Sequence, residues 1–168
     1  MNPIPSQRTR GNQQRRLRRP RAVTPARWVA WLTVRRTFDE DAWTDRAFTA
    51  AAQQLGLEDD PRERAFAQQL AYGVVQHAKQ LDHVIATLGK RPLRKVDPPV
   101  LHALRIGVFE LLHLQQATGP DGERLGSTSA HAAVSQAVEL VRGVVGERAV
   151  AFTNAILRRA QVDGAGIL

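Results

Sequence analysis

Apolar residues recur every three or four positions along most of the chain from residue 24 onward. Side chains at this spacing share one face of an α-helix. Phe66, Leu70 and Val74, for example, follow one another at intervals of four. No stretch alternates convincingly between apolar and polar residues, which is the pattern of a half-buried strand. The pattern therefore predicts helices and no sheet.

Helix start and stop signals divide this pattern into separate elements. Starts are indicated by residues that commonly cap helices, several of them followed by proline: Thr24-Pro25, Thr44, Asp60-Pro61, Asp97-Pro98 and Ser129. Asp60 and Glu63 also have the spacing of a capping box. Gly56 and Gly89 are placed to end helices. We therefore expect an all-α protein, a compact bundle of about seven helices spanning residues 24–160.

The helix that follows Asp97 is expected to lie at the centre of this bundle. Its apolar residues cover too wide an arc for a surface helix: Val100, Leu101, Leu104, Val108, Leu111 and Leu112. Beyond it, the polar, glycine-containing segment 115–129 is predicted to be a flexible loop. The last eight residues, 161–168, are predicted to form a short tail.

The net charge of +8 is concentrated at the N-terminus. Residues 1–21 hold seven arginines and no acid, whereas the other 147 residues carry 17 basic and 16 acidic side chains. With few apolar residues, this segment cannot bury enough surface to fold alone. We expect residues 1–23 to form a disordered basic arm that binds nucleic acid. An idle solvated tail and a targeting peptide are the alternative interpretations.

Two smaller basic clusters are further candidates for binding nucleic acid. The sequence KRPLRK, residues 90–95, places four cations in a loop before the central helix, and Arg158 and Arg159 are adjacent near the end of the last helix. Arginine suits phosphate contacts and base stacking because its guanidinium is planar. Each cluster could equally be an ordinary solvated face.

Several classes of function are excluded or disfavoured by what the sequence lacks. The chain contains no cysteine, which excludes disulfides, thiolate metal sites and cysteine nucleophiles. The five histidines have no metal-binding spacing, and the glycines of GPDGERLG lack the context of a phosphate-binding loop. We therefore expect no enzyme activity, cofactor or metal. No apolar run is long enough for a membrane span, and no signal peptide is evident, so a cytoplasmic protein is expected.

Three sequence blocks, in their order and spacing, resemble one known family. They are RERAFAQQLAYGVVQHAKQLDHVI, RPLRKVDPPVLHALRIGVFELLHL and AVSQAVELV followed by GERAVAFTNAILRRA. They are similar to the NusB-like RNA-binding domain over about residues 24–160. This family includes the transcription antitermination factor NusB and the N-terminal domain of the RsmB ribosomal RNA cytosine-5 methyltransferase.

The resemblance implies an RNA-binding module that acts in transcription antitermination or in ribosomal RNA transcription and processing. Its expected partners are single-stranded RNA, such as ribosomal RNA or its leader, the ribosomal protein NusE and the transcription machinery. An alternative is a detached RNA-delivery domain of an RsmB-type methyltransferase, because the catalytic cysteines and an S-adenosylmethionine-binding loop are absent. A second alternative is a helical protein-interaction domain whose arm is incidental.

The resemblance also assigns roles to individual residues. Asn154 is expected to pack inside and to hydrogen-bond the backbone of a neighbouring loop, and Asp97 is expected to be structural. Phe152 is either an RNA contact or a core residue. Together with the basic clusters, the expected RNA contacts are Arg15, Arg16, Arg18, Arg19, Arg21, Arg27, Arg91, Arg94, Lys95, Phe152, Arg158 and Arg159.

Two departures from the family pattern stand out. Ser135-Gln136 replaces the usual Asn-Glu, and the loop 116–127 is longer than usual. Both are expected to lie away from the RNA-binding face.

Overall fold

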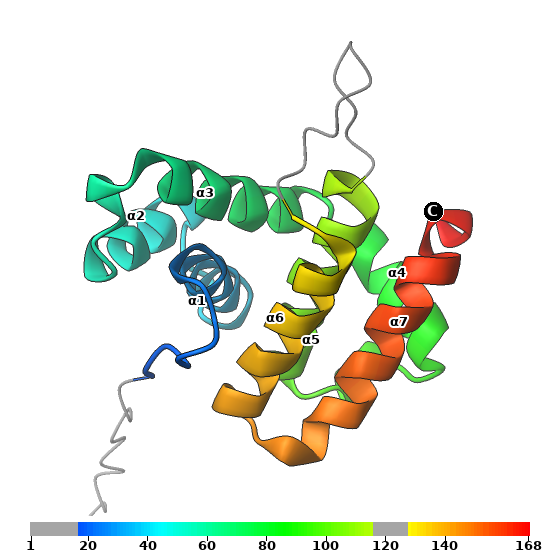
Figure 1. Cartoon of the computed structure of the whole chain (residues 1–168). Coiled ribbons are helices and arrows are strands. Elements are labelled where there is room, and N and C mark those ends of the chain that lie inside the picture. Colours follow the sequence, from blue (N-terminus) through cyan, green and yellow to red (C-terminus); the bar gives the residue numbers. More distant parts are fainter. Residues whose placement is uncertain (1–16, 116–127) are drawn as a thin grey trace, which may run out of the picture.

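The computed structural model describes residues 17–115 and 128–168, and this part of the chain contains seven α-helices and no strand (Figure 1). The prediction of an all-α bundle is confirmed. The helices are α1 (Pro25–Asp39), α2 (Thr44–Gln54), α3 (Pro61–Gln76), α4 (Ala78–Gly89), α5 (Pro98–Phe109), α6 (Ala130–Val144) and α7 (Val150–Ile167). The three short 3-10 turns are η1 (Leu57–Asp59), η2 (Leu93–Lys95) and η4 (Glu147–Ala149). The predicted loop 116–127 lies outside the described residues, so its length and role are not tested.

The predicted helix starts agree closely with the structure. Asp60 and Ser129 cap α3 and α6, and each side chain accepts a hydrogen bond from the backbone three residues later. Only α2 differs, because Trp43 rather than Thr44 holds its N-cap position. The Thr44 hydroxyl lies 3.3 Å from that of Thr37, and this contact joins α2 to the end of α1.

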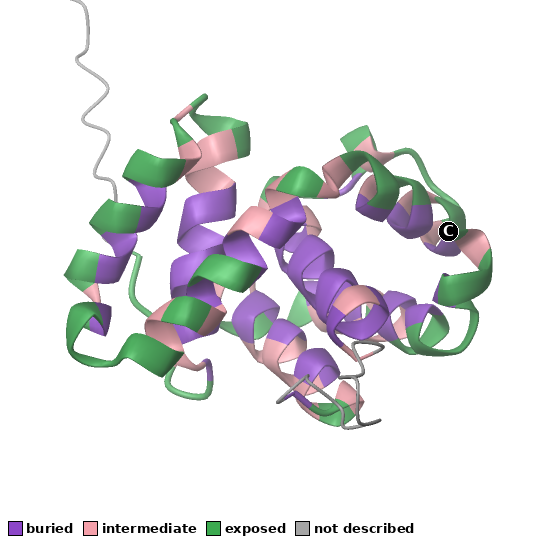
Figure 2. Ribbon diagram, turned by 90° about the horizontal axis from the view of Figure 1, so that it is seen from above, coloured by how far each residue is buried: buried purple, intermediate pink, exposed green. Residues whose placement is uncertain are grey.

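Helix α5 is the centre of the molecule, as its apolar pattern predicts. Residues 102–110 are all buried, and α1, α3, α4, α6 and α7 pack around the helix. Figure 2 shows that buried residues gather on the inward faces of the helices, whereas exposed residues lie on the outside. A Cβ atom at Gly107 would lie only 2.7 Å from the side chain of Leu157, so glycine permits the close approach of α7. The helix continues as one π-helical turn, η3 (Glu110–Leu114). This turn contributes a buried carboxylate, that of Glu110.

A second group of buried polar side chains lies on α5, between α1 and α4. The Arg105 guanidinium donates to both carboxylate oxygens of Asp82, at 2.7 and 2.8 Å, and lies 3.2 Å from Nδ1 of His102. Nε2 of His102 lies 2.9 Å from a carboxylate oxygen of Asp39 at the end of α1. His102 and Arg105 are 2% and 7% exposed. These contacts tie α1, α4 and α5 together.

None of the helices in the described part of the chain is long and apolar enough to cross a membrane. Within the same residues, no group of three His, Cys, Asp or Glu side chains could hold a metal ion.

Candidate nucleic-acid interface

The N-terminal arm joins the folded body at an ordered turn, which we call the arm root (residues 20–24). The backbone N–H of Val23 donates to the carbonyl of Pro20 at 3.0 Å, and the Val23 side chain is 1% exposed. The Pro20 ring packs on Gly143 of α6, where a Cβ atom would lie 2.4 Å from the ring. The body therefore begins at about residue 20 rather than at residue 24.

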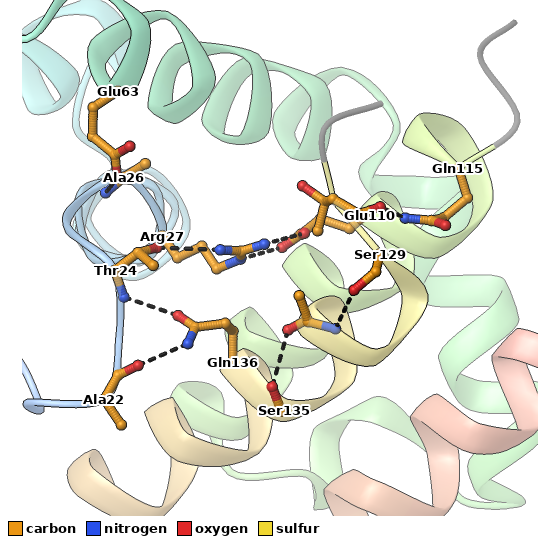
Figure 3. Close-up of polar contacts among 12 residues, drawn as sticks. Ala22, Thr24, Ala26, Arg27, Glu63, Glu110, Gln115, Ser129, Ser135 and Gln136 are labelled. Atoms are coloured by element: carbon orange, nitrogen blue, oxygen red, sulfur yellow. Dashed lines mark hydrogen bonds and ion pairs between the residues drawn. The ribbon is translucent and has the colours of Figure 1, made fainter. Parts of the chain in front are cut away.

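Gln136 of α6 holds the arm root from the other side (Figure 3). Its carbonyl oxygen accepts from the backbone N–H of Thr24 at 2.8 Å, and its amide nitrogen donates to the carbonyl of Ala22 at 2.7 Å. Position 136, which was expected to lie away from the RNA-binding face, therefore contacts the root of the basic arm. The sequence offers no signal for this contact, because the partners are more than 100 residues apart.

Helix α1 also receives a cap from α3. A carboxylate oxygen of Glu63 accepts from the backbone N–H of Ala26 at 2.9 Å (Figure 3). The predicted capping box is therefore only half formed: Asp60 accepts from the N–H of Glu63, but the Glu63 carboxylate binds α1 instead of reaching back to Asp60. Thr24 occupies the N-cap position of α1, yet its side chain makes no capping bond. Side chains from α3 and α6 thus satisfy the backbone at the start of α1.

The arginines next to the arm root are exposed to solvent. Arg18 and Arg21 are exposed. Arg19 is exposed as well, although its guanidinium donates to the carbonyl of Val23. Arg15 and Arg16, which are also predicted contacts, lie outside the described residues.

Arg27 is not exposed like the arginines next to the arm root, and its assignment as an RNA contact is corrected. Arg27 is 7% exposed, and its guanidinium donates to both carboxylate oxygens of Glu110 at 2.9 and 2.8 Å (Figure 3). It also lies 5.2 Å from the ring centre of Phe66. The reason is helical geometry: Arg27 shares the inward face of α1 with Trp31 and Val34. Burial raises the pKa of Glu110, and the paired Arg27 opposes that rise.

The cationic segment 90–95 meets the first turn of α7 through Arg91. The guanidinium carbon of Arg91 stands 4.3 Å from the ring centre of Phe152. Phe152 is half-buried and packs on the core, so the role of its ring in binding RNA remains a prediction. Arg94 and Lys95 are exposed on the short turn η2.

Asp97 joins this segment to the turn between α6 and α7. It occupies the N-cap position of α5 without a capping bond. Its carboxylate instead accepts from the guanidinium of Arg148 in η4 at 3.0 Å, in an exposed ion pair. This contact suits the structural role predicted for Asp97, although exposed pairs contribute little to stability.

The two arginines of α7 have different surroundings. Arg159 donates to the carbonyl of Leu88 at 3.0 Å and so caps the last turn of α4. Arg158 lies about 100° further around the helix. Its Nε donates to the side-chain oxygen of Asn154 at 3.3 Å. The two guanidinium groups therefore have different hydrogen-bond partners, and the RNA-binding role of the pair stays a prediction.

Asn154 is not the buried, backbone-bonded residue that the resemblance implies. It is half-buried, and its recorded hydrogen bond is the one to Arg158 on the exposed side of the helix. Thr153 is the fully buried polar residue here, and its hydroxyl donates to the carbonyl of Ala149 at 2.8 Å in the preceding turn. Thr153, Ile156 and Leu157 form the inward face of α7, and Asn154 lies at the margin of this face.

These contacts connect three basic segments along one edge of the molecule. Pro20 meets the end of α6, Arg148 of the following turn meets Asp97, and Arg91 meets α7. We call this surface the basic edge; its cations are Arg18, Arg19, Arg21, Lys90, Arg91, Arg94, Lys95, Arg148 and Arg159.

The acidic side chains recorded along the basic edge are paired with arginines. Asp97 binds Arg148, and both Glu139 and Glu147 bind Arg142. The edge therefore keeps an excess of positive charge, which suits a polyanion.

Comparisons with known proteins give two kinds of relatives. A putative methyltransferase from Mycobacterium tuberculosis is 32% identical over 140 residues, which is 83% of this chain. A probable ribosomal RNA small subunit methyltransferase B from Synechocystis is 34% identical over 81% of this chain. The chain spans only 28% of the length of either protein. The transcription antitermination protein NusB of Halorhodospira halophila is 32% identical over 68% of this chain and 63% of its own length.

The fold is similar to that of one chain in a solved complex. A crystal structure of the antitermination factors NusB and NusE with double-stranded RNA contains a chain that matches with a TM-score of 0.70 and 21% identity. The match covers 82% of this chain and 93% of the solved one. The NusB family model matches residues 24–162, nearly the whole described body. The chain therefore belongs to the NusB family.

Proposed function

We propose that this protein is an RNA-binding module that acts in ribosomal RNA transcription or processing, and that the basic edge is its RNA-binding surface. The observation that carries the proposal is the connection of the arm root, segment 90–95 and α7 into one cationic surface. The relatives support it by their names, since they include an antitermination protein and a ribosomal RNA methyltransferase. A role on ribosomal RNA implies a cytoplasmic protein.

The chemistry of the basic edge favours single-stranded RNA. Exposed arginines neutralise phosphates, and arginine guanidinium groups such as that of Arg91, 4.3 Å from the ring centre of Phe152, stack on unstacked bases. In an A-form duplex the base edges of the narrow major groove are out of reach. The similar solved complex contains double-stranded RNA, so the same sequence should be tested in both forms.

A salt series tests the proposal. The variant Arg18→Gln/Arg21→Gln removes two exposed charges beside the arm root. Each phosphate contact to a single strand contributes about 0.7 to the slope of log affinity against log salt. We expect the double variant to reduce the slope by about 1.4.

The matched control is Arg46→Gln/Lys79→Gln, which removes two exposed charges from α2 and α4. It should bind RNA with an unchanged slope, because neither residue belongs to the basic edge. Equal slopes for all three proteins would refute the proposed surface. Wild-type protein that binds no RNA at any salt concentration would instead favour a helical protein-interaction domain.

A second candidate function is delivery of ribosomal RNA to a separate methyltransferase catalytic chain. It is favoured by the methyltransferase relatives, which match over more than 80% of this chain but only 28% of their own length. In this proposal the protein itself performs no chemistry, consistent with a sequence that has no cysteine. The test adds the protein to an isolated cytosine-5 methyltransferase domain and measures ribosomal RNA methylation.

Stimulated methylation would favour delivery, whereas readthrough in a reconstituted antitermination assay would favour a NusB-like factor. That assay should include the ribosomal protein NusE, which accompanies NusB in the similar solved complex. We propose NusE as a partner of this chain as well.

A further inference from the structure

Apart from the buried Val23 side chain, the arm root is held by few contacts, and their chemistry is specific. Residues 22 and 24 are gripped by one side chain, Gln136, which uses its oxygen as an acceptor and its nitrogen as a donor. The Pro20 ring packs on Gly143, which lies seven residues after Gln136 in the same helix. Positions seven apart lie on one face of a helix, so α6 presents a continuous seat for the incoming chain.

We propose that Gln136 is a positioning residue for RNA binding: it fixes the path of residues 18–24 over the body, without contacting RNA itself. This inference rests on the proposed function. An arm whose root is rigid presents Arg18, Arg19 and Arg21 beside the rest of the basic edge. RNA then binds without the cost of ordering the root first.

Only an amide performs this role at position 136. The N–H of Thr24 needs an acceptor and the carbonyl of Ala22 needs a donor, and both needs are met by one glutamine side chain. Glutamate would keep the bond from Thr24 but would place a carboxylate oxygen against the carbonyl of Ala22. Methionine has a similar length and would make neither bond.

The contact is also well placed to act on RNA rather than on stability. Gln136 is only partly buried, and the backbone that it holds precedes the first helix. Water can replace its hydrogen bonds when the root detaches. Loss of Gln136 should therefore loosen residues 17–22, while the buried Val23 side chain keeps its place in the core.

The experiment compares Gln136→Met and Gln136→Glu with Gln69→Met, a control at an exposed position of α3. RNA affinity and its salt slope are measured for each. Because the chain has no cysteine, spin labels can be placed uniquely with Leu17→Cys and Gln161→Cys, both at exposed positions. The width of the distance distribution between them reports how firmly the arm root is held.

We expect Gln136→Met to weaken RNA binding by about three- to tenfold, the range of one or two lost hydrogen bonds. Its salt slope should stay unchanged, because every arginine is still present. The distance distribution should broaden. Gln136→Glu should fall between wild type and Gln136→Met at elevated salt, where its added charge is screened. The Gln69→Met control should behave as wild type.

Gly143→Ala gives an independent check, since its methyl group must displace the Pro20 ring while alanine favours the helix. It should broaden the distribution and weaken binding in the same way, even if a Gln136 variant folds poorly. A narrow distribution and wild-type affinity for Gln136→Met would overturn the inference and leave the proposed function intact. A wild-type protein that binds no RNA would refute the proposed function, whatever the spin labels report.

Discussion

Arginines occupy two contrasting regions of this molecule. In the interior, Arg27 and Arg105 are each 7% exposed and donate to a carboxylate through two nitrogens. On the basic edge, Arg18 and Arg21 are exposed at the start of the described chain. A buried arginine stays with its carboxylate partner because separating the pair would leave an unpaired charge in the interior. An exposed arginine remains available to an external anion. The same side chain therefore stabilises the fold in one region and recruits a ligand in the other.

The largest effect is expected when an interior arginine is removed. Arg27→Met leaves the Glu110 carboxylate buried without its partner and should destabilise the protein by about 3–5 kcal/mol. Denaturant unfolding measures this change. Adding Glu110→Met should restore most of the lost stability, because no uncompensated charge remains. A loss below about 1 kcal/mol for the single variant at high pH, where Glu110 stays ionised, would mean that water reaches Glu110 and that the interior region is wrongly described.

A smaller effect is expected on the basic edge, where the Phe152 ring supports Arg91. Phe152→Ala should weaken RNA binding by about 0.5–1 kcal/mol, because the Arg91 guanidinium loses the ring on which it packs, and should leave the salt slope unchanged. Arg91→Gln should instead lower the slope by about 0.7. Binding titrations across a salt series measure both. A Phe152→Ala protein that melts early but binds RNA normally would assign Phe152 to the core alone.

The interior should also respond to pH where the edge does not. Burial lowers the pKa of His102, despite the opposing effect of Asp39. The neutral imidazole is therefore favoured in the folded state, and this stabilisation is present above the unfolded pKa of about 6.5. It is lost as the pH falls through the lowered pKa of the folded state.

Thermal unfolding between neutral and mildly acidic pH should thus show a falling melting temperature. His102→Gln should flatten part of this dependence. His113, whose pKa is lowered by burial and by the nearby His77, should contribute in the same direction. An identical pH dependence for wild type and His102→Gln would exclude His102 as a contributor.

The smallest effect is expected at Asn154, which belongs to neither region. Its side chain accepts one long hydrogen bond from Arg158 near the surface. Asn154→Leu should therefore change the free energy of unfolding by only about 0.5 kcal/mol or less. Chemical denaturation measures this change. A loss of 1 kcal/mol or more would reinstate the buried role that the family resemblance suggests.

Features that depend on near neighbours in the chain could be predicted from the sequence. The central position of α5 follows from its own apolar arc, and the caps of Asp60 and Ser129 act within three residues. The turn at Gly56 has the expected left-handed backbone, with a φ of 67°. Each is local chemistry that a single sequence displays.

Contacts made by long polar side chains could not be predicted in this way. Glu63 has the spacing of a capping box, yet its carboxylate binds α1, 37 residues away. Arg27 is an RNA contact by family resemblance, whereas helical phase directs it to Glu110, 83 residues away. The sequence shows that segment 90–95 and the arm are basic. It does not show that Arg148 and Asp97 would form an ion pair between them. Which polar groups meet is decided by tertiary packing.

The bond between Thr24 and Gln136 has a consequence for how the protein folds. It joins residues 112 positions apart and so closes a loop of most of the described chain. Contacts of such high sequence separation form late, because loop closure is entropically costly until the intervening helices have packed. The amide hydrogens of Thr24 and Ala26 are bonded to side chains of α6 and α3, outside the hydrogen-bond ladder of α1. Their protection from hydrogen exchange during refolding would therefore time the docking of α6 and α3 separately, at two neighbouring positions of the backbone.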